Sequence, residues 1–327
     1  MTITIILFIL GFVFLIKGAD ILIDGSSSIA KRFGLSAFFI GLTIVAFGTS
    51  APELVINIMA NIKGNSGIVL GNIIGANIAN TLLILGVAAV ISPLVIKRRT
   101  IHKEIPYLLL AILAVGILSN DFLFTNFQPD GLDRIDGLMM LLFFIIFVFY
   151  TFGISREEEN IFQKTVGELK AQENKEYSLF KAIAMILAGL GGLIFGGHWV
   201  VNGAIGIAHY FNFSQAFVGL TILAIGTTLP ELAASAMAAY RGRTDMAVGN
   251  IIGSNIFNFL LILGLSATIK PIQYNNVLNI DILMLLVVTI MLLPLIYIGR
   301  KNIIGRWEGV ALLLIYGLYL TFLILRG

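Results

Sequence analysis

The chain contains ten long apolar runs, and this pattern limits its possible folds more than any other feature. Most runs are about 20 residues long, which is the length of helix that crosses the hydrocarbon core of a bilayer. Hydrophobic residues make up 58% of the chain and charged residues only 12%, more apolar surface than a soluble fold can bury. We therefore predict an all-α integral membrane protein with ten transmembrane helices. The predicted spans are 2–24, 36–61, 67–92, 104–120, 132–153, 179–209, 214–240, 246–270, 277–298 and 305–325.

The chain also repeats itself. Residues 41–86 read GLTIVAFGTSAPEL at the start and GNIIGANIANTLLILG at the end, and residues 219–264 read GLTILAIGTTLPEL and GNIIGSNIFNFLLILG. The two segments align without a gap at an offset of 178 residues, with 26 of 46 positions identical, glycine, proline, glutamate and asparagine among them. Each half holds five spans, an odd number, so the second copy enters the membrane in the opposite sense. This is an inverted repeat, an architecture typical of secondary transporters.

The predicted division is a first repeat at 1–154, a polar linker at 155–178 and a second repeat at 179–327. If the N-terminus lies outside, inner segments carry 16 basic residues and outer segments 4. The inner ones are Lys31, Arg32, Lys97, Arg98, Arg99, Lys103, Arg156, Lys164, Lys170, Lys175, Lys181, Arg241, Arg243, Arg300, Lys301 and Arg306, and the outer ones are Lys63, Arg134, Lys270 and Arg326. Because basic loops stay in the cytoplasm, we expect a plasma-membrane protein with both termini outside and a cytoplasmic linker.

Two glutamates stand alone in apolar surroundings. Glu53 is the only acidic residue within 25–103, and Glu231 is the only one within 177–244. An ionisable side chain near the middle of a span is costly unless it is compensated, so it indicates function by default. A protonated glutamate that hydrogen-bonds neighbouring helices is the structural alternative. Equivalent positions in an inverted repeat favour the functional interpretation.

A proline precedes each glutamate. Pro52 lacks an amide hydrogen and its ring clashes with the carbonyl of Gly48, and Pro230 has the same effect in the second half. We therefore predict that spans 2 and 7 break near the middle of the membrane and free carbonyls within 46–49 and 224–227. Irregular backbone at that depth must line a polar cavity or be buried in protein. Carbonyl, hydroxyl and carboxylate oxygens are hard ligands that suit Na⁺ or Ca²⁺.

A second motif, GNIIGxNIxN, places polar residues on one face of spans 3 and 8. Their spacing is four residues, about one helical turn. The face residues are Asn72, Ala76 and Asn80 in span 3, and Asn250, Ser254 and Asn258 in span 8. Paired glycines in both spans predict close helix contact. The asparagines are either ion ligands or partners in interhelical hydrogen bonds.

The remaining charged residues of the spans are weaker candidates. Lys17, Asp20 and Asp24 lie toward the inner end of span 1, where we expect them to pair with one another or to extend to the membrane surface. Asp281 and Glu308 lie near span ends and are expected to face water.

The motifs GTSAPE and GTTLPE, each followed by GNIIGxN, resemble the two α-repeats of the sodium/calcium exchanger family within the cation/Ca²⁺ antiporter superfamily. The resemblance covers the whole chain and is to a compact prokaryotic type, because the linker is too short for a regulatory Ca²⁺-binding domain. It implies an ion pathway made by spans 2, 3, 7 and 8, across which spans 1 and 6 slide. The implied Ca²⁺ ligands are Glu53, Glu231 and the carbonyls of Thr49 and Thr227. The implied Na⁺ ligands are Ser50 with the carbonyl of Ala46, and Thr228 and Ser254 with the carbonyl of Ala224, while Asn80 and Asn258 complete the central site.

The sequence departs from the family pattern at two of these positions. Ala76 stands where one archaeal pattern has a Na⁺-ligating serine, which weakens one Na⁺ site or leaves it to water. Asn258 stands where K⁺-dependent members have aspartate, which favours K⁺ independence.

The expected function is Na⁺/Ca²⁺ antiport by alternating access, with Ca²⁺ extrusion. An H⁺/Ca²⁺ antiporter of the same fold and a cation channel are the alternatives. We expect no enzyme activity, since the chain shows no nucleophile–base set. We also expect no cofactor, no nucleic-acid partner and no obligatory protein partner; the expected partners are inorganic cations and the lipid bilayer.

Overall fold

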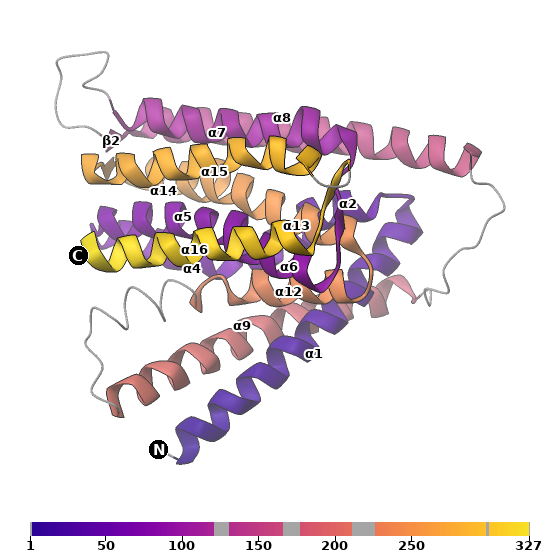
Figure 1. The fold of residues 1–327 in the computed structure, drawn as a ribbon, viewed down its shortest axis with the longest axis horizontal. Helices are drawn as coiled ribbons and strands as arrows, with labels where there is room; N and C mark the ends of the chain where they lie inside the picture. Colours follow the sequence, from indigo (N-terminus) through magenta and orange to yellow (C-terminus); the bar gives the residue numbers. More distant parts are fainter. Residues whose placement is uncertain (1, 121–130, 166–176, 211–225, 299–300, 327) are drawn as a thin grey trace.

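The computed structural model describes residues 2–120, 131–165, 177–210, 226–298 and 301–326, and these are nearly all helical (Figure 1). The first half contains α1 (Thr2–Phe33), α2 (Ala37–Ile40), the π-helix η1 (Gly41–Val45), α3 (Ala46–Thr49), α4 (Ala51–Ile62), α5 (Ser66–Ala79), the π-helix η2 (Asn80–Ile84), α6 (Leu85–Ile91), β1 (Leu94–Val95), the π-helix η3 (Thr100–Glu104), α7 (Ile105–Leu118), β2 (Gly131–Leu132) and α8 (Arg134–Thr165). The second half contains α9 (Leu179–Tyr210), α12 (Leu229–Tyr240), α13 (Thr244–Ile256), the π-helix η6 (Phe257–Leu263), α14 (Gly264–Ile269), β3 (Ile272–Gln273), the 3₁₀ helix η7 (Asn276–Leu278), α15 (Asn279–Ile298), β4 (Ile303–Ile304) and α16 (Arg306–Arg326).

The predicted all-α membrane architecture is confirmed. The described residues contain eight helices long and apolar enough to cross a membrane, and a ninth span if the bent pair 37–49 and 51–62 counts as one. The predicted span 214–240 lies partly outside the described residues, which resume at residue 226. Two helices extend further than their predicted spans. Helix α1 continues past residue 24 to Phe33, and α8 continues past residue 153 to Thr165, into the predicted linker.

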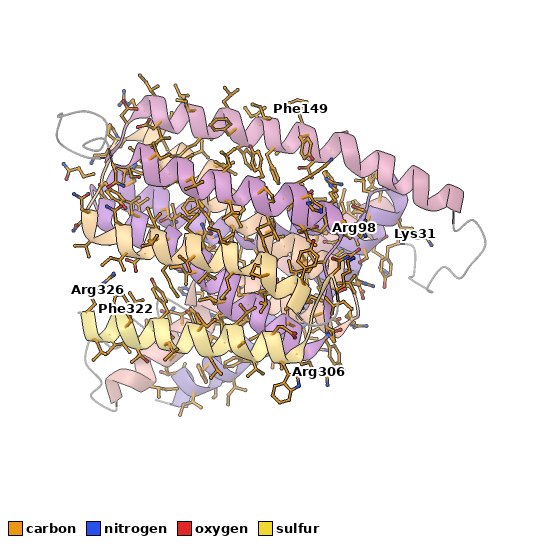
Figure 2. The ribbon with its side chains drawn as sticks, turned by 45° about the horizontal axis from the view of Figure 1, so that its top comes forward. Lys31, Arg98, Phe149, Arg306, Phe322 and Arg326 are labelled. Atoms are coloured by element: carbon orange, nitrogen blue, oxygen red, sulfur yellow. The ribbon has the colours of Figure 1, made fainter. Side chains whose placement is uncertain are left out.

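The two ends of the helix bundle differ. Both termini lie at one end, on the left of Figure 1, and α8 ends and α9 begins at the other. Lys31, Arg98 and Arg306, all predicted to lie inside, gather toward the end where α8 finishes, whereas Arg326 lies at the end that carries the termini (Figure 2). These four residues are divided between the two ends as the count of basic residues predicted. Which end faces the cytoplasm stays a prediction.

Span 2 bends where the proline predicted a break. The segments 37–49 and 51–62 meet at 46°, and Pro52 occupies the first turn of α4. Ser50, at the junction, leaves the helical region with φ −84° and ψ 5°, and Thr228 has nearly the same values, −89° and 3°, before Pro230 in α12. The helices α4 and α12 therefore begin with the same backbone geometry. The reason is that each has a proline in its first turn.

Glycines allow α1 and α9 to pack at backbone distance, antiparallel and side by side (Figure 1). A Cβ atom on Gly18 would lie 2.8 Å from the carbonyl oxygen of Gly189, and one on Gly11 would lie 2.8 Å from that of Gly196. Only glycine tolerates such an approach, so the two backbones contact each other directly at these positions.

Two short antiparallel pairs of strands connect the halves. Strand β1 pairs with β4, with Leu94 opposite Ile304, and β2 pairs with β3, with Leu132 opposite Ile272. Each pair joins the loop after the repeated segment of one half to the loop before the last span of the other half. The halves are therefore connected through their loops as well as through their helices.

The sequence suggested that Asp20 and Asp24 pair with Lys17 or extend to the membrane surface. In the structure their ion-pair partners are arginines of the second half instead. Asp20 forms an ion pair with Arg241, and Asp24 forms one with Arg243 at 3.1 Å. Both arginines flank the turn between α12 and α13, so their charges reach α1 only through packing of the two halves. Lys17 is exposed.

The contact between α1 and α9 predicts unequal effects of alanine at two glycines of one helix. A Cβ on Gly189 would lie 2.6 Å from the amide nitrogen of Leu22, whereas a Cβ on Gly191 meets no described atom within 4 Å. Gly189→Ala should lower the free energy of unfolding by about 1–3 kcal/mol, the typical cost of overpacking.

Gly191→Ala is the matched control. It should be neutral or stabilising, since alanine favours the helix by about 1 kcal/mol relative to glycine. Thermal unfolding of the detergent-solubilised protein measures both effects. Equal melting temperatures for the two variants would contradict the proposed packing.

Candidate functional site

The two isolated glutamates occupy matching places in the structure. Glu53 lies in the first turn of α4 and Glu231 in the first turn of α12, each directly after a proline, and each is 2% exposed. The N-terminal end of a helix stabilises negative charge. Ser50, three residues before Glu53, hydrogen-bonds the carboxyl group of Glu231 at 2.8 Å, so the two glutamates lie near each other. The packing of the halves thus concentrates both acidic groups in one buried place.

A hydroxyl cluster connects span 2 to spans 7 and 8. Ser50 Oγ donates a hydrogen bond of 2.8 Å to Glu231 Oε1 and lies 3.1 Å from Ser254 Oγ. Thr49 Oγ1 lies 3.3 Å from both Asn250 Oδ1 and the carbonyl oxygen of Ala46. Residues that are about 200 positions apart in the sequence therefore share one buried set of oxygen atoms.

The prediction that the break frees the Ala46 carbonyl is wrong. That oxygen accepts a hydrogen bond of 3.0 Å from the amide of Ser50, because the helix persists to the junction itself. The carbonyl that loses its donor is that of Gly48, four residues before Pro52. Ala46 stays near the site through its contact with the Thr49 hydroxyl. Ala224, its predicted counterpart, lies outside the described residues.

Only part of this cluster follows the repeat symmetry. Thr227 Oγ1 lies 3.4 Å from Asn72 Oδ1, which is the counterpart of the Thr49–Asn250 contact. Thr228 corresponds to Ser50 and is buried, but the residue that corresponds to Ser254 is Ala76, which has no hydroxyl. At this pair of positions the two halves therefore differ by one hydroxyl oxygen.

Asparagines orient one another across the two repeats. Asn80 Nδ2 donates to Asn255 Oδ1 at 3.0 Å, and Asn258 Nδ2 donates to Asn77 Oδ1 at 2.9 Å. Asn255 Nδ2 in turn donates to Thr81 Oγ1 at 3.0 Å. The interhelical hydrogen bonds that the sequence offered as one alternative are therefore present, and they hold the asparagine side chains in place.

Sequence reasoning missed Thr81. Its counterpart in the second half is Phe259, so the repeat comparison did not mark it. Its only sequence signal is a polar residue directly after the asparagine motif. The structure shows its role as an acceptor for a buried amide.

The site retains buried oxygen atoms without a hydrogen-bond donor. Among the described residues, neither carboxyl oxygen of Glu53 has a partner, nor does Glu231 Oε2. The same holds for Oδ1 of Asn80 and Oδ1 of Asn258. Buried acceptors are normally satisfied, so such a group needs an explanation. Bound cations are one such explanation, because carboxylate, amide and hydroxyl oxygens suit hard ions.

A site for a soft metal is not formed by the part of the chain that the structure describes. Within it, no three residues of the types His, Cys, Asp and Glu gather in one place. The two glutamates are surrounded by neutral oxygen groups instead, a composition that favours Na⁺ and Ca²⁺ over zinc or copper.

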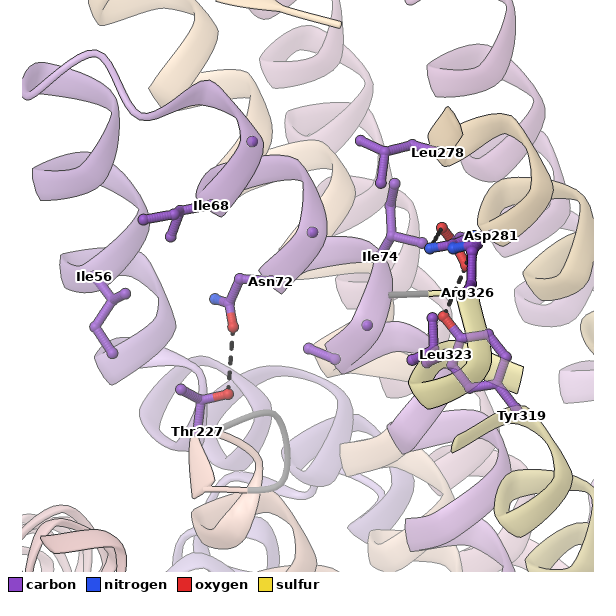
Figure 3. Close-up of a pocket in the computed structure, with 14 residues that line it drawn as sticks. Ile56, Ile68, Asn72, Ile74, Thr227, Leu278, Asp281, Tyr319, Leu323 and Arg326 are labelled. Carbon is purple, nitrogen blue, oxygen red and sulfur yellow. Dashed lines mark hydrogen bonds and ion pairs between the residues drawn. The ribbon is translucent and has the colours of Figure 1, made fainter. Parts of the chain in front are cut away.

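A cavity of 610 Å³ reaches the edge of this site (Figure 3). Described residues of α4, α5, α15 and α16 line it together with Thr227, and Asn72 points toward Thr227 at its rim. Cβ atoms on Gly71 or Gly75 would meet no described atom within 4 Å, whereas one on Gly253 would collide with the carbonyl of Leu42. The predicted close contact is thus confirmed for the glycine motif of span 8, and in span 3 the same glycines border open space.

The prediction that Asp281 faces water is wrong. Its side chain is 4% exposed and forms an ion pair of 2.9 Å with Arg326. The hydroxyl of Tyr319 donates to it at 3.0 Å. The reason is that α15 and α16 are antiparallel neighbours, so the first turn of one lies beside the last turn of the other. Glu308, by contrast, remains partly exposed.

The chain resembles known proteins over almost its whole length. The family model described as "Sodium/calcium exchanger protein" matches residues 3–153 and 181–325. The chain belongs to the sodium/calcium exchanger family. Members of this family are cation/Ca²⁺ antiporters, and this chain shares that class of activity.

Individual relatives agree with this membership. The sodium/calcium exchanger MaX1 of Methanosarcina acetivorans is 32% identical over 98% of this chain and 99% of its own, and the inner membrane protein YrbG of Escherichia coli is 33% identical over 81% and 79%. A solved structure of the sodium-calcium exchanger NCX_Mj, soaked with zero Na⁺ and Ca²⁺, superimposes with a TM-score of 0.80 at 30% identity and covers 98% of both chains. The fold of this exchanger is therefore shared with a compact relative of nearly equal extent.

The asparagine network of the exchanger predicts a specific effect at Thr81. Thr81→Val keeps the shape of the side chain but removes the acceptor of Asn255 Nδ2, which leaves a buried donor unpaired. Such a loss costs about 1–3 kcal/mol of stability.

Thr81→Ser retains the hydroxyl and is the matched control. Thermal unfolding in detergent should rank the serine variant close to the wild type and the valine variant clearly below it. A valine variant as stable as the serine variant would show that the Asn255 amide does not depend on Thr81.

Proposed function

We propose that this exchanger couples the movement of Na⁺ to the extrusion of Ca²⁺ by alternating access. The observation that carries the proposal is the pair of buried glutamates, Glu53 and Glu231, because three of their four carboxyl oxygens lack a donor among the described residues. The hydroxyl of Ser50 donates to Glu231 and lies beside the hydroxyl of Ser254. The site offers negative charge and neutral oxygen ligands together, as competition between divalent and monovalent cations requires.

Charge balance explains how such a site exchanges ions without covalent chemistry. The two carboxylates supply about two negative charges, which one Ca²⁺ or a set of Na⁺ ions neutralises. The empty, charged site is unfavourable inside an apolar bundle. The protein therefore changes its access only when the site is loaded with one ion type or the other, and antiport follows.

We assign the ligands in accordance with the family resemblance. Ca²⁺ is bound by Glu53, Glu231 and the carbonyls of Thr49 and Thr227. Na⁺ is bound on one side by Ser50 near Ala46, and on the other by Thr228, Ser254 and the carbonyl of Ala224, with Asn80 and Asn258 at the centre.

Hydroxyl groups next to the carboxylates favour Na⁺ over H⁺ as the coupling ion. A proton needs only the carboxylate, whereas Na⁺ needs several neutral oxygens as well. Ser50 provides such an oxygen 2.8 Å from Glu231. The relatives support this choice, since MaX1 carries the name sodium/calcium exchanger and NCX_Mj was studied in Na⁺ and Ca²⁺. An H⁺/Ca²⁺ antiporter and a channel remain outcomes of the test below.

The conformational change is assigned to the α1–α9 pair. These helices contact each other through glycines, which offer little resistance to sliding. Arg326 lines the cavity and lies at the end of the bundle that carries both termini (Figure 2). With the topology predicted from basic residues, that end is the outer one, so we assign the cavity to an outward-facing state.

Transport assays in proteoliposomes test the function directly. Vesicles loaded with Na⁺ should take up ⁴⁵Ca²⁺, and vesicles with an equal K⁺ or H⁺ gradient should not. Glu53→Gln and Glu231→Gln should abolish uptake, because each keeps the side-chain shape but removes one of the two charges that balance Ca²⁺.

Asp133→Asn is the control for loss of a carboxylate. This residue is exposed and caps α8 through its Oδ1, which accepts from the amide of Ile135 at 2.7 Å, and asparagine can do the same. Its variant should transport normally. Uptake driven only by a proton gradient would establish the H⁺/Ca²⁺ alternative, and ⁴⁵Ca²⁺ flux without any counter-ion would indicate a channel.

The missing hydroxyl at position 76 predicts that Na⁺ affinity can be changed in both directions. Ala76→Ser gives the first half the serine that the second half has at position 254, and this variant should lower the Na⁺ concentration for half-maximal exchange. Ser254→Ala removes that serine and should raise the same concentration. One hydrogen-bond-like ligand contributes about 0.5–1.5 kcal/mol, which is a factor of roughly 2–10.

The Na⁺ dependence of ⁴⁵Ca²⁺ exchange measures both variants, and the Ca²⁺ dependence serves as the internal control. Ca²⁺ affinity should change much less than Na⁺ affinity. The assignment fails if Ser254→Ala weakens Ca²⁺ and leaves Na⁺ unchanged.

A further inference from the structure

One charged pair lies in the wall of the cavity, opposite the rim that leads to the site. Of the described residues that line the cavity, Asp281 and Arg326 are the only charged ones. In Figure 3 they face each other on one wall, with Tyr319 beside them, and Asn72 and Thr227 lie on the other side. The rest of the lining is mainly aliphatic or glycine. A cation in the cavity therefore lies between this pair on one wall and the Thr227–Asn72 rim on the other.

The contacts keep Arg326 in a defined position. Its two terminal nitrogens donate to Asp281 Oδ1 at 3.2 Å and to Oδ2 at 2.9 Å. Its guanidinium lies 5.4 Å from the centre of the Phe322 ring, and the Tyr319 hydroxyl donates to Asp281 Oδ1 at 3.0 Å. The arginine side chain is 26% exposed and the aspartate 4%. The carboxylate is thus the fixed, buried partner, and the guanidinium is the partner that can reach water.

The pair is not part of the scaffold that the two repeats share. The segment RIDG at 134–137 aligns with RWEG at 306–309 at an offset of 172 residues, and this alignment places Ile154 opposite Arg326. The basic residue is therefore a feature of the second half alone. Because Arg326 lines the cavity and has no basic counterpart in the first half, we expect its role to concern the cavity rather than the fold that the repeats share.

We propose that Asp281 is an entry ligand for the incoming cation and that Arg326 is a tethered cation that occupies it between ions. This inference rests on the proposed function, since it assumes that the cavity admits the exchanged ions. While the pair is intact, the cavity wall has no net charge. A Na⁺ or Ca²⁺ ion competes with the guanidinium for the carboxylate and then passes to the rim at Thr227. In apolar surroundings a single unpaired charge acts strongly on an entering ion.

The proposal predicts effects of opposite sign for the two single variants. Arg326→Gln leaves Asp281 uncompensated and should lower the cation concentration for half-maximal exchange on the cavity side about three- to tenfold. Asp281→Asn leaves the guanidinium uncompensated and should raise it by a similar factor. The double variant, Asp281→Asn with Arg326→Gln, should return close to the wild type because the wall is again neutral.

Two further variants separate charge from structure. Arg326→Lys keeps the positive charge and Tyr319→Phe removes only a neutral hydrogen bond, so both should stay within about twofold of the wild type. Choline chloride on the cavity side should reduce the shifts of the two single variants, since salt screens exposed charges. If Arg326→Gln does not fold, Arg326→Met replaces it, because methionine keeps an apolar contact with Phe322.

The measurement is Na⁺-dependent ⁴⁵Ca²⁺ exchange with the cation varied on the cavity side, in parallel with Glu231→Gln as the inactive reference. Shifts of opposite sign that cancel in the double variant support the proposal. Shifts of the same sign, or unchanged affinities in all variants, overturn it and assign the pair a structural role. Absence of cation-dependent exchange in the wild type would instead overturn the proposed function itself, so the two failures are distinguishable.

Discussion

The desolvation of two carboxylates inside an apolar helix bundle is the constraint on which the rest of the site depends. Glu53 and Glu231 are both about 2% exposed, and each lies at the first turn of a helix that starts after a proline. Neither has a basic residue as its hydrogen-bond partner among the described residues, and Glu231 accepts from the hydroxyl of Ser50. Partial compensation comes from helix ends and hydroxyl groups, and in the function we propose a bound cation supplies the remainder. A site that was fully compensated by the protein would have no reason to bind one.

The inverted repeat makes this compensation nearly symmetric and leaves defined exceptions. The Thr49–Asn250 contact of 3.3 Å has its counterpart in the Thr227–Asn72 contact of 3.4 Å. The hydrogen bond from Asn80 to Asn255 has its counterpart in the one from Asn258 to Asn77. Other contacts occur once. The hydroxyl of Ser254 has no counterpart in the first half, where the equivalent residue is Ala76. The hydrogen-bond acceptor Thr81 has no counterpart in the second half, where the equivalent residue is Phe259. The symmetric contacts hold the residues at the centre of the site, and in the function we propose the asymmetric ones give the two sides different affinities for Na⁺.

Charges outside the centre distinguish the two ends of the molecule. At one end, Asp20 and Asp24 of α1 pair with arginines beside the α12–α13 turn. The corresponding positions of α9 are His198 and Asn202, which hydrogen-bond each other at 2.8 Å. At the other end, the Asp281–Arg326 pair borders the open cavity. Ion pairs therefore join helices at both ends, and only the pair at the end that carries the termini lines the cavity.

The sequence by itself determined the membrane class, the helical content, the repeat and the positions of the breaks, because each depends on local composition or on comparison of the chain with itself. Apolar length predicted the spans, Pro52 predicted the bend before α4, and the isolation of Glu53 and Glu231 marked them as candidates. The boundaries of α1 and α8 were less accurate, since polar residues continue a helix beyond the bilayer as readily as they end it.

Tertiary structure alone decided which partners meet. Ser50 bonds Glu231 rather than a residue of its own half, and Asn255 relies on Thr81, 174 positions away. Asp20, Asp24 and Asp281 all found basic partners that local spacing did not indicate. The physical reason is that a buried polar group pairs with whatever the packing of helices brings within about 3 Å. For Ser50, Asn255, Asp20 and Asp24 that neighbour comes from the opposite half of the chain, so the residue types of the site were readable in the sequence but their pairing was not.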